Sequence, residues 1–199
     1  MNIIEFNKVK NFTYHEYCDY LQQKYGIGRA NYMTPAYNPV AKCKRTSEGL
    51  FAHHKYEDTA ILLSTKAEAM QHPFEYQLAE NIVYCDYLEH LLLHVLIVSH
   101  PSPNKVSNNI VGYGGVVNFI VPELNDLYSG WVPNQQWKIN CWNLVKDDRD
   151  VYFEILKMFS KGKHYYGIRT LLTSFNHQFG LWDIKNNTDL FNMMIGELE

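Results

Sequence analysis

The chain has 199 residues, of which 46% are hydrophobic and 20% charged, so wholesale disorder is excluded. Its formal net charge of -3 at pH 7 excludes a generally basic nucleic-acid-binding protein, although a local basic patch remains compatible. The sequence contains no apolar run of 18 residues and no secretory signal, so we expect no membrane partner. Its four cysteines form no CxxC pair, which argues against a disulfide framework and favours a cytoplasmic setting.

The first predicted element is a helix over residues 13–25, which Gly26 ends. Residues 30–49 follow as a predicted loop with a basic KCKR run. Residues 1–46 carry a net charge of +4, whereas residues 47–98 carry -6. The candidate phosphate contacts in the basic part are Arg29, Lys42, Lys44 and Arg45, and an ordinary solvated loop is the alternative.

Two short strands and a helix are predicted next. Leu50–His54 and Ile82–Tyr84 are runs of strand-forming residues, with a helical turn expected near Lys66–Met70 between them. Residues 86–98 then form the clearest predicted helix, because Asp86 and Glu89 have the spacing of a capping box.

Histidines gather in these elements. His53 and His54 end the first predicted strand, while His90 and His94 are four residues apart on the helix. Residues four apart share one helical face, so two imidazoles there can bind one metal ion with a third ligand from outside. Three imidazoles favour Zn²⁺, Ni²⁺ or Mn²⁺ over Mg²⁺, although Mg²⁺ can still be the ion used in the cell.

Residues 50–94 resemble the HNH (ββα-metal) nuclease motif in its all-histidine form. The segments GLFAHH and ENIVYCDYLEHLLLH supply the strand ending in a His pair, the strand-initial Asn81, and the helix with two histidines. The resemblance implies an α+β protein with a ββα-metal core, an N-terminal helix and a mixed C-terminal extension. The 26 residues between His54 and Asn81 exceed the length in compact members of the family.

The resemblance also implies a role for each matched residue. His54 would be the general base that activates water, and Asn81 would hold the loop that positions it. His53, His90 and His94 would bind one divalent metal ion, either Mg²⁺, Mn²⁺, Zn²⁺ or Ni²⁺. The alternative is a purely structural role, in which His90 and His94 are half-buried side chains among leucines with their hydrogen bonds satisfied. Glu57 and Asp58 are expected to be solvated loop acids, with a supporting contact to a ligating histidine as the less favoured alternative.

A boundary is predicted at the Pro- and Asn-rich stretch after residue 98, dividing the chain into a nuclease domain, 1–98, and a C-terminal region, 99–199. In the second region we expect a helix around Val151–Phe159 and a turn or bulged strand at Gly112–Gly115. This region would bind the target or a partner, or form a homodimer on a palindromic site.

These features predict a metal-dependent endonuclease acting on nucleic acid, with DNA favoured. The competing interpretation is an interaction protein, such as a phage- or mobile-element-encoded inhibitor that keeps the HNH fold and binds a defence nuclease. The negative net charge and the Trp-rich C-terminal half favour this alternative. The presence of His54 as a base beside three ligand positions favours the endonuclease interpretation, since a protein that only binds a partner needs neither a base nor a metal ion.

Overall fold

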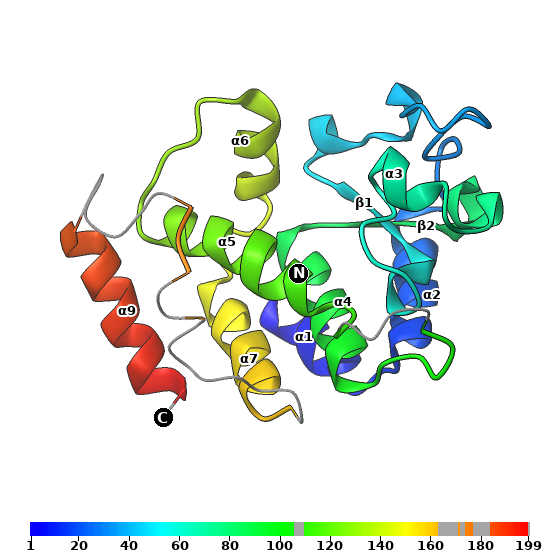
Figure 1. The fold of residues 1–199 in the computed structure, drawn as a ribbon. Helices are drawn as coiled ribbons and strands as arrows, with labels where there is room; N and C mark the ends of the chain where they lie inside the picture. Colours follow the sequence, from blue (N-terminus) through cyan, green and yellow to red (C-terminus); the bar gives the residue numbers. More distant parts are fainter. Residues whose placement is uncertain (106–109, 163–170, 172–173, 177–183, 199) are drawn as a thin grey trace.

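A computed structural model describes residues 1–105, 110–162, 171, 174–176 and 184–198. The chain is mostly helical and contains one two-stranded antiparallel sheet, which confirms the α+β class (Figure 1). Within these residues no helix combines the length and apolar character needed to cross a bilayer.

The N-terminal part forms two helices, α1 (Ile3–Val9) and α2 (Tyr14–Tyr25). The helix predicted over residues 13–25 is confirmed, with Thr13 as its N-cap. Thr13 and Glu16 form a reciprocal capping box, and Gly26 ends the helix with a φ of 81°. Helix α1 was not expected from the sequence pattern, because it is only seven residues long.

The sheet pairs β1 (Phe51–His54) with β2 (Ile82–Cys85), so both strand predictions are confirmed within a residue. In this antiparallel register His53 lies opposite Val83 and His54 lies opposite Ile82. The long connection between the strands consists of 3₁₀ turns and the short helix α3 (Lys66–Ala69). Strand, long connection, strand and helix therefore follow one another in the predicted order.

Helix α4 (Tyr87–Ser99) occupies the centre of the molecule (Figure 1). Its capping box is confirmed, because Asp86 accepts from the Glu89 backbone and the Glu89 side chain accepts from the Asp86 backbone. Almost all of its side chains are buried, since the sheet and α2 cover one side and later helices cover the other. The helix that carries two candidate ligands is thus fixed on several sides.

The second half contributes a π-helical stretch, Gly115–Ile120, that continues into α5 (Val121–Tyr128). The helices α6 (Gln136–Asn143), α7 (Arg149–Ser160) and α9 (Ile184–Leu198) complete the described part. The helix predicted around residues 151–159 is confirmed as α7. Where the structure describes residues 110–198, the regular elements are helices, so the expected mixed extension is wrong there. The strand alternative for Gly112–Gly115 is also wrong, because a turn leads directly into helix.

The hydrophobic core does not stop at residue 98. One cluster of buried apolar side chains includes Phe6, Leu21 and Leu92 from the first region together with Val116 and Leu156 from the second. Helix α4 packs against α2 on one side and against α7 and the π-helical stretch on the other. The predicted division at residue 98 thus falls at the end of helix α4, which side chains of both regions bury. Separate functions for the two regions remain a prediction.

Candidate metal centre

Strand β1 sends its two histidines to opposite faces of the sheet, because neighbouring strand residues alternate. The side chains of both are about 1% exposed. His53 faces α4 and lies 5.2 Å from the His90 ring and 5.1 Å from the His94 ring, measured between centroids. His54 instead packs under Tyr32, with 4.3 Å between the ring centroids. Only His53 therefore joins the helical pair.

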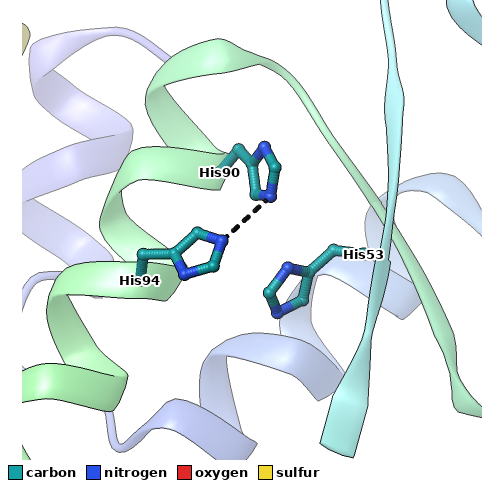
Figure 2. Close-up of side chains that lie close together, drawn as sticks. All are labelled: His53, His90 and His94. Atoms are coloured by element: carbon teal, nitrogen blue, oxygen red, sulfur yellow. Dashed lines mark hydrogen bonds between the residues drawn. The ribbon is translucent and has the colours of Figure 1, made fainter. Parts of the chain in front are cut away.

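Helix α4 presents His90 and His94 on one face, one turn apart. Their Nε2 atoms lie 3.2 Å apart (Figure 2). Together with His53 they form a cluster in which one ring nitrogen from each residue lies within 4.8 Å of the others. A buried triad of this kind could hold a metal ion, as the spacing of the histidines predicted.

A hydrogen-bond network selects which nitrogen of His53 faces the cluster. The Tyr14 hydroxyl from α2 lies 3.2 Å from the His54 carbonyl, to which it donates, and 2.9 Å from His53 Nε2. Because a hydroxyl has one proton, it must accept from His53 Nε2, so Nδ1 keeps its lone pair. This buried Nδ1 has no hydrogen-bond partner among the described residues. Such an orphaned lone pair fits a metal ligand better than a satisfied core histidine.

Burial also keeps the rings neutral. It lowers the pKa of His53 to about 3 and that of His90 well below the ordinary value, and it lowers the pKa of His94 as well. The nearby Glu57 carboxylate opposes these shifts without reversing them. Metal binding requires neutral imidazoles, so the cluster can accept a cation without first losing protons.

The backbone of the second half supports His94 directly. A Cβ built on Gly115 would lie 2.3 Å from His94 Nδ1, so any larger residue at position 115 would collide with the ring. A Cβ built on Gly112, whose φ is 79°, would lie 2.9 Å from the His94 carbonyl oxygen. The Gly112–Gly115 motif thus provides the close backbone approach that fixes a candidate ligand.

Glu57 lies beside the candidate ligands, which the sequence interpretation gave only as its less favoured alternative. It lies in the 3₁₀ turn Lys55–Asp58 directly after β1, and its side chain is only 18% exposed. Its neighbour Asp58 is also buried and lies 3.2 Å from His15. The expectation of solvated loop acids is therefore wrong, because the turn folds both carboxylates back against the protein. The spacing HHxxE, followed by a helical turn, is the signal that could have identified Glu57.

The Glu57 carboxylate lies among three histidines. Oε2 is 3.6 Å from His53 Nδ1 and 3.5 Å from His94 Nε2, while Oε1 is 3.6 Å from His54 Nδ1. Burial raises the pKa of this carboxyl, but the surrounding imidazoles outweigh that effect and hold the pKa below its usual range. Glu57 is therefore an anion beside the candidate cation site.

His54, the predicted base, also has a defined tautomer. Gln77 donates from Nε2 to the Leu63 carbonyl at 3.1 Å, which leaves its Oε1 to face His54 Nε2 at 3.2 Å. His54 Nε2 must therefore carry the proton, and Nδ1 is the proton-accepting atom. Asn81, the other predicted catalytic residue, donates to the Glu75 carbonyl at 2.8 Å and so closes the short loop that carries Gln77.

The four basic residues of the first region fall into two pairs. Arg29 and Arg45 both form ion pairs with Glu48, and the Arg45 guanidinium also stacks over the Tyr84 ring. Lys42 and Lys44 are exposed, and within the described part of the chain neither forms an ion pair. The lysines are therefore the members of this set that are free to contact a phosphate.

Comparison with known proteins finds no match to this chain among family models, curated proteins or solved structures. What the cluster can do therefore follows from its own residues and geometry. Those residues are three neutral imidazoles, a carboxylate beside them, and a fourth imidazole with a free Nδ1 on the other face of β1. This combination supplies both metal ligands and a proton acceptor.

Proposed function

We propose that this protein is a metal-dependent endonuclease that hydrolyses phosphodiester bonds in nucleic acid, with DNA as the favoured substrate. The observation that carries the proposal is the convergence of His53 from β1 with His90 and His94 from α4. The order β1, β2, α4 also agrees with the ββα-metal motif that the sequence resembles. A bound divalent ion would act as a Lewis acid and neutralise charge on the leaving oxygen.

The protein's own residues would divide the remaining work. His53 through Nδ1, together with one ring nitrogen each of His90 and His94, would hold the ion, which would replace the hydrogen bond between the two helical histidines. His54 Nδ1 would take a proton from the attacking water, because Gln77 keeps the opposite nitrogen protonated. His90 and Glu57 are the partly exposed residues of the site, so water and phosphate would enter between them.

A plasmid-nicking assay with Mg²⁺ or Mn²⁺, with and without chelator, tests this proposal. We expect the wild-type protein to nick DNA only with metal, and the His90→Ala variant to lose both nicking and metal binding. His100→Ala is the matched control, because His100 is an exposed histidine at the C-terminal end of the same helix. A wild-type protein that binds metal but neither cuts nor binds nucleic acid would favour the protein-binding alternative instead.

A further inference from the structure

The position of Glu57 is not explained by hydrogen bonding. Its distances to the three histidine nitrogens, 3.5 to 3.6 Å, exceed the roughly 2.7–3.2 Å of an N–H···O bond. The contact with His54, although 3.6 Å long, helps to lower the pKa of the carboxyl, but none of the three contacts has the length of a normal hydrogen bond. A largely buried carboxylate without such partners is costly unless a cation lies beside it.

The tautomers sharpen this point. Tyr14 fixes the proton of His53 on Nε2, and Gln77 fixes that of His54 on Nε2 as well. Both Nδ1 atoms therefore direct lone pairs toward the Glu57 carboxylate, one to each oxygen. Lone pairs facing an anion repel it, so the arrangement is favourable only when positive charge lies between them.

The distances also agree with a shared metal ion. In a tetrahedral site with ligand bonds of about 2.0–2.2 Å, neighbouring ligand atoms are separated by roughly 3.3–3.6 Å. Here Glu57 Oε2 is 3.5 Å from His94 Nε2 and 3.6 Å from His53 Nδ1. His94 Nε2 and His90 Nε2 are 3.2 Å apart. The carboxylate oxygen is thus close enough to His53 and His94 to reach an ion shared with them, and the histidine nitrogens, which lie within 4.8 Å of one another, would draw together around that ion.

We propose that Glu57 is the fourth protein ligand of the metal centre through Oε2, while Oε1 remains beside His54. This inference rests on the metal centre of the proposed function but not on cleavage. A carboxylate ligand lowers the net charge of the site and adds affinity for ions such as Mn²⁺. Four protein ligands close a tetrahedral Zn²⁺ site, whereas a six-coordinate ion keeps positions for phosphate and water. Zn²⁺ should therefore bind tightly and support less cleavage than Mn²⁺.

Titration with Co²⁺ tests the ligand directly, because its visible spectrum reports the donor atoms. We expect Glu57→Gln to lower Co²⁺ affinity by at least about tenfold, because loss of a residue that only supports a ligand already costs that much. The visible spectrum should shift as well. Asp58→Asn is the matched control, since it neutralises the adjacent buried carboxylate, which pairs with His15. Its spectrum should equal that of the wild type.

Each outcome separates this inference from the metal centre itself. If the wild type binds no Co²⁺, the metal centre fails, and with it the proposed function. If the wild type binds Co²⁺ and Glu57→Gln has the same affinity and spectrum, only the Glu57 ligand is overturned. A lower affinity with an unchanged spectrum also overturns it, because Glu57 would then act as a nearby charge. If Glu57→Gln does not fold, the affinity and spectrum of Glu57→Asp test the inference instead. This variant keeps the negative charge but moves the carboxylate oxygen away from the metal centre.

Discussion

The two faces of β1 place adjacent histidines in different surroundings. On the α4 side, His53 lies between the Tyr14 hydroxyl and the pair formed by His90 and His94. On the opposite side, His54 is covered by Tyr32 and hydrogen-bonded to Gln77. Both rings are buried and both have a free Nδ1, yet only one of them can reach the helical histidines.

This difference shows how two identical side chains acquire separate tasks. Strand alternation separates the rings, and one hydrogen bond to each Nε2 fixes the tautomer. Glu57 approaches Nδ1 of both histidines, because it follows the strand in a turn and reaches around its end. The α4 face therefore holds the candidate ligands, and the opposite face holds the candidate proton acceptor.

The largest expected effect comes from breaking the His54 face alone. His54→Ala should lower the rate of DNA cleavage by about 10²–10⁴-fold, the usual loss for a general base. Metal affinity should stay close to that of the wild type, because His54 is not part of the triad. Nicking assays and Co²⁺ titrations of the same preparation measure both quantities. Cleavage at the wild-type rate would show that His54 is not the base.

A smaller effect is expected from breaking the contact that orients His53. Tyr14→Phe removes the hydroxyl that accepts from His53 Nε2, and losing such a partner lowers metal affinity by about 10–100-fold. Tyr17→Phe is the matched control, because its hydroxyl is equally buried but contacts the Met1 sulfur instead. Equal Co²⁺ affinities in the two variants would contradict the role given to Tyr14.

The sequence predicted the local elements of the site but not its supporting contacts. The capped helix with His90 and His94 and the strand with His53 were predictable, because each depends on a pattern a few residues long. The contact of Glu57 with a histidine was only the less favoured alternative, since it depends on the turn that follows β1. Tyr14 lies in the predicted helix over residues 13–25, but its hydroxyl partners come from 39 and 40 residues away.

The second half shows the same limit more strongly. Its β-branched and Gly-rich run gave no helical signal, yet it folds as a π-helical stretch because Val116 and Val117 can bury themselves against the core. The contact of Gly115 with His94 joins residues 21 apart in sequence. Local patterns cannot predict a contact that exists only after both elements have packed.

Acid should destabilise the metal-free protein, which tests the neutral rings of the α4 face. Burial lowers the pKa of His53 from 6.5 to about 3, so between these values the unfolded chain binds a proton that the folded protein does not. The free energy of unfolding should therefore fall as pH drops below about 6.5, by up to about 1.4 kcal/mol per pH unit for each such histidine. Urea unfolding at pH 7, 6 and 5 with chelator measures this slope. His53→Gln should reduce the slope by the share of one histidine, and a wild-type slope that is already flat would contradict the neutral assignment.

The smallest expected effect concerns the exposed lysines Lys42 and Lys44, which precede the His53–His54 pair in sequence. A protein of net charge -3 needs a local positive patch to bind DNA, and Lys42 and Lys44 are free to provide one, whereas Arg29 and Arg45 are paired with Glu48. Removing both lysines should lower the slope of log affinity against log salt by about 1.8, or 0.9 per phosphate contact. All DNA sequences should weaken alike, because phosphate contacts carry no base identity. Lys8→Ala/Lys10→Ala removes the same charge from the α1 region and is the control. An equal change in both double variants would mean that net charge, and not the 42–44 loop, determines DNA binding.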